Sequence, residues 1–91
     1  MLADKEQLKL LLSRARQMAE GNEPDEAARI CHGVLEEQPN EINALVILAY
    51  TYWKAKRTAT AYHLGMRATQ IAPANPIAWI NLGLACKPGA R

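Results

Sequence analysis

Apolar residues recur at intervals of three and four positions along most of the chain, which is the spacing of one face of an α-helix. In the first such stretch, about 4–20, the recurring residues are Leu8, Leu11, Leu12, Ala15, Met18 and Ala19. Asp4 is the expected N-cap, and Gly21 with Asn22 is expected to end the helix. No alternating pattern predicts a strand anywhere in the chain.

Four further helices are expected, joined by short turns. The second begins at Pro24, where the missing N–H costs nothing, and ends before Pro39. The third, about 41–55, is apolar on nearly every side, which predicts burial between neighbours. The fourth spans 58–71, and its expected inward residues are Ala61, Leu64, Gly65, Ala68 and Ile71. The fifth begins at Pro76 and cannot pass 87–89.

A 34-residue period relates these helices. Four positions of the fifth helix have equivalents in the third and the first: Trp79, Leu45 and Leu11; Leu82, Leu48 and Arg14; Gly83, Ala49 and Ala15; Cys86, Tyr52 and Met18. The intervening helices repeat too, since Ala27 precedes Ala61, and Pro39 precedes Pro73, by the same interval. This period, with residue types at fixed places and a proline near the end, resembles the tetratricopeptide repeat across 8–86.

The resemblance implies an all-α fold, a helix-turn-helix solenoid of about two and a half tetratricopeptide repeats in five helices. It implies a single domain over 1–91, with repeats at about 8–41 and 42–75, a half repeat at 76–87 and a tail at 88–91. The chain departs from the family pattern at Arg14, Cys31 and Gly65, where larger apolar residues are usual. Gly65 costs roughly 1 kcal/mol relative to alanine inside a helix, so it predicts a close helix contact.

The composition fits one small domain. Of 91 residues, 49% are hydrophobic, which excludes a disordered chain. No apolar run reaches the ~18 to 20 residues that span a bilayer, and charges interrupt the amino-terminal segment, so neither a membrane span nor a secretory signal is expected. We expect a cytoplasmic location. Cys31 and Cys86 are interpreted as small buried residues rather than as a disulfide.

The two parts of the chain differ in charge. Residues 1–41 hold five basic and nine acidic side chains, a net −4, whereas residues 42–91 hold six basic side chains and no acidic one, a net +6. Sampling on a small surface explains such a split. The alternative is a dipolar module whose basic end meets an acidic surface, such as the acidic end of a neighbour.

Candidate chemistry is sparse, and no enzyme activity, metal or cofactor is expected. The one serine, two histidines and two aspartates lie far apart along a regular repeat. Cys31 and His32 are adjacent, but neighbouring residues on a helix point about 100° apart and do not form a natural chelate. The basic turn of Lys54, Lys56 and Arg57 fits a solvated surface better than a nucleic-acid site.

The resemblance implies that the first helix of each repeat lines a concave, peptide-binding groove. The residues it places there are Leu12, Arg16, Asn43, Val46, Ile47, Tyr50, Trp53, Lys54, Ile77, Ile80, Asn81 and Leu84. Part of the family holds a terminal carboxylate with basic and amide side chains at five of these places. Here those places hold Leu12, Arg16, Ile47, Ile77 and Asn81, so that clamp is missing, and the groove instead suits an amphipathic helix or an apolar extended peptide.

Tyr50 and Trp53 share one face of the third helix and are the expected anchor of the groove. The alternative is that these rings pack within the fold. The sequence therefore predicts a module that binds a peptide or helix of a partner protein. Two other functions stay open, an assembly element that self-associates or continues a longer superhelix, and a docking domain cut from a larger enzyme. Because 76–87 is apolar around most of its circumference, self-association through this helix is also expected.

Overall fold

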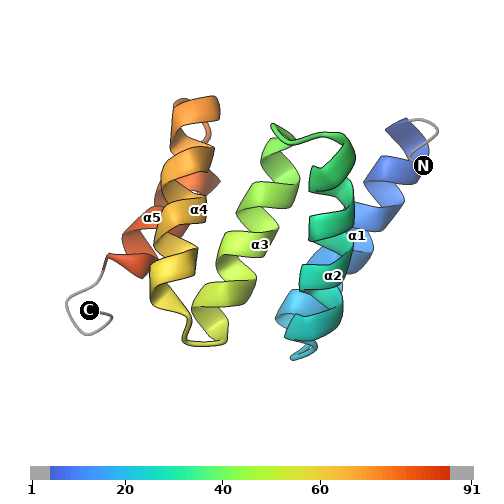
Figure 1. The fold of residues 1–91 in the computed structure, drawn as a ribbon, viewed down its shortest axis with the longest axis horizontal. Coiled ribbons are helices and arrows are strands. Elements are labelled where there is room, and N and C mark those ends of the chain that lie inside the picture. The colour runs from blue at the N-terminus through green and yellow to red at the C-terminus, as the bar shows by residue number, and fades with distance from the viewer. Residues whose placement is uncertain (1–4, 87–91) are drawn as a thin grey trace.

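The computed structural model describes residues 5–86, which form five α-helices and no strand (Figure 1). The helices are α1 (Lys5–Glu20), α2 (Pro24–Glu37), α3 (Ile42–Lys54), α4 (Thr58–Ile71) and α5 (Pro76–Ala85). These bounds agree with the sequence-based prediction to within one residue, apart from the end of α5, for which only a limit was predicted. The expected Asp4 cap and the tail at 88–91 lie outside the described residues.

Local chemistry explains where the helices begin. The Asn75 side chain accepts hydrogen bonds from the backbone N–H groups of Ile77 and Ala78, at 2.9 and 3.4 Å, and Pro76 occupies the first turn of α5. The Glu41 carboxylate accepts from the N–H of Asn43 at the start of α3. Helix α2 begins with Pro24 and has Asp25 and Glu26 in its first turn, where acidic groups favour the helix dipole.

The turns repeat with the same 34-residue interval as the sequence. After α1, the N–H of Glu23 donates to the carbonyl of Met18, and after α3 the N–H of Arg57 donates to the carbonyl of Tyr52. The turn residues at equivalent places, Asn22 and Lys56, both have positive φ, at 76° and 65°. The sequence repeat is therefore also a repeat of backbone conformation.

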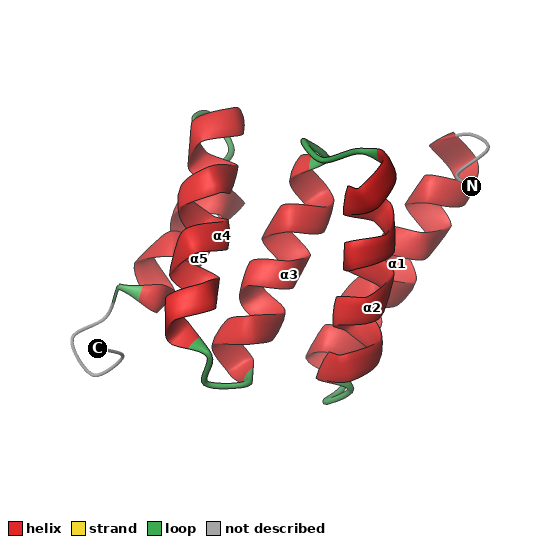
Figure 2. Cartoon of the chain, viewed as in Figure 1, coloured by secondary structure: helices red, strands yellow, loops and turns green. Residues whose placement is uncertain are grey.

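Helix α3 is the centre of the fold and packs against all four other helices. Figure 2 shows the helices in a row joined by short loops, with α3 between the α1–α2 pair and the α4–α5 pair. Leu45 and Leu48 of α3 are fully buried, at 0% exposure each. This placement confirms the expectation that an almost uniformly apolar helix lies between neighbours.

Gly65 confirms the predicted close contact. A Cβ atom at this position would lie 3.1 Å from the Cα and 3.3 Å from the Cβ of Leu82, so α4 and α5 approach each other here more closely than a larger residue would ordinarily permit. Two other expectations were wrong. Ile71 is 37% exposed because it is the last residue of α4, and Cys86 is exposed because it follows the last helical residue of α5. Cys31 is buried and free.

Candidate functional site

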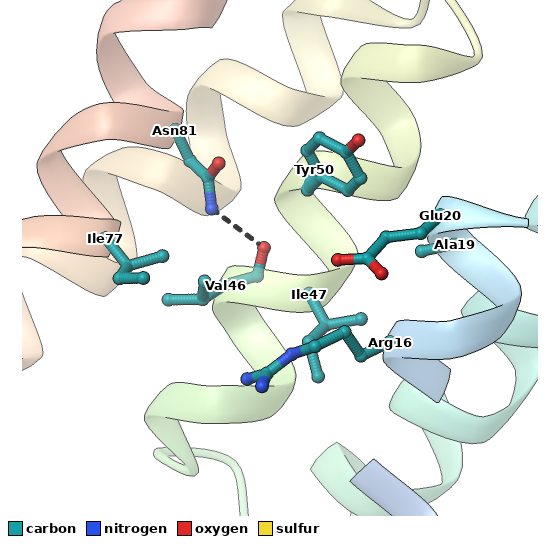
Figure 3. A pocket seen from close by; sticks show the side chains of 8 residues that line it. All are labelled: Arg16, Ala19, Glu20, Val46, Ile47, Tyr50, Ile77 and Asn81. Carbon is teal, nitrogen blue, oxygen red and sulfur yellow. Dashed lines mark hydrogen bonds between the residues drawn. The ribbon is translucent and has the colours of Figure 1, made fainter. Parts of the chain in front are cut away.

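A pocket of about 380 Å³ lies across the first, third and fifth helices. We call it the central pocket. Helix α1 provides one side of it, α3 the floor and α5 the other side, as Figure 3 shows. Its lining residues are Arg16, Ala19, Glu20, Val46, Ile47, Tyr50, Ile77 and Asn81. Six of these residues belong to the groove set that the family resemblance implied.

The floor of the central pocket is apolar. Val46 and Ile47 are 8% and 4% exposed, so they present only a small apolar area to the pocket and are otherwise held in the core. Tyr50 is half-buried one helical turn further along α3. Across from α1, Ile77 is 51% exposed and lines the pocket from α5. Because the floor residues are fixed by packing, the pocket is formed without any ligand.

One buried amide links the α5 side of the pocket to its α3 floor. Asn81 is 6% exposed, and its Nδ2 atom donates a hydrogen bond of 3.0 Å to the backbone carbonyl of Val46 (Figure 3). A buried amide without a partner would cost about 1–3 kcal/mol, so this bond lets a polar group occupy the α3–α5 boundary. Asn81 therefore ties α5 to the floor of the pocket.

The α1 side carries two opposite charges. Arg16 and Glu20 lie one helical turn apart, the spacing at which such side chains often pair. Within the described part of the chain no ion pair joins them. Figure 3 shows the Glu20 carboxylate directed from α1 toward the pocket, and the Arg16 side chain extending from α1 toward α3, below Ile47 in the view. An acidic and a basic group of a bound molecule could each find a partner on this side.

Lys54 and the two rings stand at one end of the central pocket. The Lys54 Nζ atom donates to the carbonyls of Ala19 and Glu20 at 3.1 and 3.4 Å, and lies 5.6 Å from the centre of the Tyr50 ring. A cation at the end of a helix satisfies carbonyls that have no partner within the helix. Lys54 thus joins the end of α1 to the end of α3.

Trp53 supports Tyr50 and does not line the central pocket. The two ring centres are 5.9 Å apart with an angle of 34° between the planes, and both residues are half-buried. This geometry is one that packed aromatic rings favour. Tyr50 and Trp53 therefore share one face of α3, as predicted, and of the two rings only Tyr50 lines the pocket.

The remaining groove candidates lie elsewhere. Leu12 was expected in the groove but is 7% exposed in the core cluster with Ala15 and Ile30, because α3 covers that side of α1. Asn43 is exposed in the first turn of α3, outside the pocket lining. Ile80 is 60% exposed and Leu84 is half-buried, and neither lines the pocket.

Sequence reasoning missed two lining residues, Ala19 and Glu20. A signal for them was available, since they stand one repeat period before Trp53 and Lys54, which were both included. The repeat register thus relates Ala19 and Glu20 to the predicted groove set, although Trp53 and Lys54 themselves do not line the pocket. What it does not show is that Lys54 binds the carbonyls of these same two residues.

A second hollow, of about 280 Å³, lies between α1 and α2. It is lined by Leu11, Arg14, Arg29, Ile30, Gly33, Val34 and Glu37. Beside it Arg29 forms an ion pair with Glu26, one turn away on α2. The hydrogen bond from Arg29 lowers the pKa of Glu26 below its usual value. Both side chains are on the surface, where such pairs contribute little to stability.

Cys31 and His32, which were considered for possible chemistry, are a buried thiol and a hydrogen-bonded imidazole. Burial raises the pKa of Cys31 to about 12, which keeps its thiol protonated near neutral pH. The His32 Nε2 atom shares a hydrogen bond of 3.0 Å with the Tyr52 hydroxyl. Residues 5–86 contain no group of three or more side chains arranged to hold a metal ion. No helix in this range is both long and apolar enough to cross a bilayer.

Comparison with protein-family models, with curated proteins and with solved structures found no match to this chain.

Proposed function

We propose that this chain is a protein-interaction module that binds a peptide or helix of a partner protein in the central pocket. The observation that carries the proposal is the pocket itself, because it is open and preformed and has an apolar floor. The pocket collects residues from alternate helices, and two pairs of them, Arg16 with Tyr50 and Ile47 with Asn81, are one 34-residue period apart. Pockets of this kind and size are typical of sites for side chains of a ligand.

The helical frame supports the same proposal. The turns recur with the sequence period, and small residues recur at one position as Ala15, Ala49 and Gly83. In our proposal the chain consists of about two and a half tetratricopeptide repeats, whose first helices form a continuous surface. The central pocket is then the part of that surface spanned by all three of those helices.

The lining favours a particular ligand chemistry. An aliphatic or aromatic side chain fits among Val46, Ile47, Tyr50 and Ile77, where it loses contact with water. Polar groups of the same ligand lie toward Arg16 and Glu20 on the α1 side. An amphipathic helix or an extended peptide with one apolar anchor satisfies both requirements.

Selection from a random peptide library on the immobilised full chain tests the proposal. We expect the recovered peptides to carry an apolar anchor and to shift NMR signals of residues lining the central pocket. Ile77→Lys, which places a charge in the pocket, should weaken peptide binding by roughly tenfold or more, the loss expected for an anchor contact of about 1.4 kcal/mol.

Ile80→Lys is the matched control. It makes the same change on the same helix at a residue that is 60% exposed and does not line the pocket. Peptide affinity should therefore stay close to that of the unmodified chain. Equal losses in the two variants, or peptides whose NMR shifts map away from the pocket, would rule out the central pocket as the binding site.

A further inference from the structure

The two ends of the helical row expose large apolar side chains. On α5, Ile77 and Trp79 are each 51% exposed and Ile80 is 60% exposed. At the opposite end, Leu10 of α1 is 70% exposed. The outer surface of a terminal repeat is normally polar, because no neighbour covers it. Both ends of this row therefore differ from ordinary terminal surfaces.

The repeat register shows that Ile80 lacks the covering neighbour that its equivalents have. Leu12, Val46 and Ile80 follow one another at the repeat period and occupy the same place in successive repeats. Leu12 and Val46 are 7% and 8% exposed, whereas Ile80 is 60% exposed. In the first two repeats the following repeat covers this place. In the third, no described residue does so.

Leu10, at the other end of the row, is likewise uncovered where its equivalents are buried. Its equivalents in the next two repeats, Ala44 and Ala78, are both 0% exposed, while Leu10 is 70% exposed. Ala44 belongs to the same core cluster as Leu12, and Ala78 to the same cluster as Val46. Each internal boundary thus combines a Leu12-type residue of one repeat with a Leu10-type residue of the next. Within residues 5–86, Ile80 and Leu10 are the two residues of this pattern that have no counterpart packed against them.

We propose that the α5 face of one copy packs against the α1 face of a second copy, head to tail, so that Ile80 meets the second copy's Leu10. This contact between two molecules would reproduce the repeat-to-repeat boundary that occurs twice within the chain. It goes beyond the binding of a peptide in the central pocket and uses residues outside that pocket.

The repeat register favours this arrangement over pairing of two α5 faces. Head-to-tail contact places Ile80 against a residue of the Leu10 type, as both internal boundaries do, whereas pairing of α5 faces would leave Leu10 exposed in both copies. Charge does not oppose the contact, because α1 carries four basic and two acidic side chains but α5 carries no charged side chain.

The contact is open-ended and weak. Because a head-to-tail interface uses two different surfaces, each added copy presents a free α5 face again unless a ring closes. Within the chain α3 rests on both α1 and α2, whereas the intermolecular boundary has only α5 on one side. A boundary one helix wide buries little area, so association is expected at high protein concentration.

Two exposed-residue variants test the proposal on the full chain, Leu10→Lys to block the head face and Ile80→Lys to block the tail face. Sedimentation equilibrium of the unmodified chain at millimolar concentration should show an average mass that keeps rising with concentration. Each variant alone should be a monomer. A mixture of the two should form a one-to-one complex, because it retains one intact head and one intact tail.

Far-ultraviolet circular dichroism should show that both variants keep the helicity of the unmodified chain. If Leu10→Lys associates as well as the unmodified chain, the α5 faces pair with each other and the head-to-tail contact is wrong. An unmodified chain that stays monomeric at millimolar concentration overturns the proposal outright. Neither result would affect the peptide-binding test.

Discussion

The close approach of α4 and α5 at Gly65 gives a sharp test of the packing. Replacing a helix-interior glycine with alanine normally stabilises a helix by up to about 1 kcal/mol. At Gly65 the added Cβ would lie 3.1 Å from the Cα of Leu82, tighter than ordinary van der Waals contact. The obstructing atom belongs to the backbone of α5, so a side-chain rotation cannot relieve it and α5 itself must move.

Two opposing terms therefore set the effect of Gly65→Ala. Overpacking a well-packed boundary typically costs about 1–3 kcal/mol, against the helix-propensity gain of about 1 kcal/mol. We expect a net loss of about 1 kcal/mol in the free energy of unfolding. Gly33→Ala is the matched control, because Gly33 is also inside a helix but has nothing within 4 Å of the added Cβ. That variant should gain roughly 0.5–1 kcal/mol.

Urea denaturation followed by circular dichroism measures both changes, with the unfolding midpoint read at constant slope. The two variants should differ by about 2 kcal/mol, with opposite signs relative to the unmodified chain. If Gly65→Ala gains as much stability as Gly33→Ala, then α5 yields without cost. In that case the close α4–α5 contact does not contribute to holding α5 in place.

Three further predictions concern the pocket and the thiols. Tyr50→Ala combined with Trp53→Ala should weaken a pocket-bound peptide by several kcal/mol, as measured by calorimetry, with helicity mostly retained; unfolding of the double variant would show that the rings are core. Asn81→Ala should lower the free energy of unfolding by about 1 kcal/mol, because the hydrogen bond to the Val46 carbonyl is lost. Asn81→Asp should lower it further, because a carboxylate cannot donate that hydrogen bond. If urea denaturation shows equal stability for both variants and the unmodified chain, Asn81 does not have this role. With a thiol reagent near neutral pH, exposed Cys86 should react far faster than buried Cys31, and equal labelling rates in mass spectrometry would exclude this difference. Because burial raises the pKa of Cys31 to about 12, the stability contributed by its protonated thiol should be fully present below about pH 9 and should decline as the pH rises toward about 12.

The helices were predictable because their ends carry strong local signals. Pro24 and Pro76 lie in first turns, Asn75 is an N-cap, and Asn22 takes the positive φ that ends a helix with little strain. These effects act within a few residues along the chain, so the sequence alone reveals them. The close contact at Gly65 was also predictable, because a glycine inside a helix costs roughly 1 kcal/mol relative to alanine and is expected only where the packing requires it.

The pocket was only partly predictable, because its details depend on contacts between distant residues. Leu12 is apolar and lies on the first helix of a repeat, which fits both a groove surface and a boundary with the next repeat. Only the position of α3 decides between them. Lys54 is charged and exposed in its helix pattern, yet its amino group binds carbonyls of Ala19 and Glu20, at the end of α1 in the preceding repeat. No local rule points to such a bond.

The repeat register separates positions that keep one residue type in every repeat from positions whose residue type changes along the chain. The frame position holding Ala15, Ala49 and Gly83 is small in every repeat, and the boundary position holding Leu12, Val46 and Ile80 is aliphatic in every repeat.

Two positions that contribute to the central pocket behave differently, since Arg16 is replaced one repeat later by Tyr50, and Ile47 one repeat later by Asn81. The frame thus repeats while the pocket lining changes from charged at α1 to apolar and aromatic at α3, and Ile77 is its exposed aliphatic residue on α5. In the function that we propose, a ligand lying across the central pocket meets a different chemistry at each helix, so its two directions are not equivalent. We therefore expect a bound peptide to adopt a single orientation, with its polar groups toward α1 and its apolar groups toward α5.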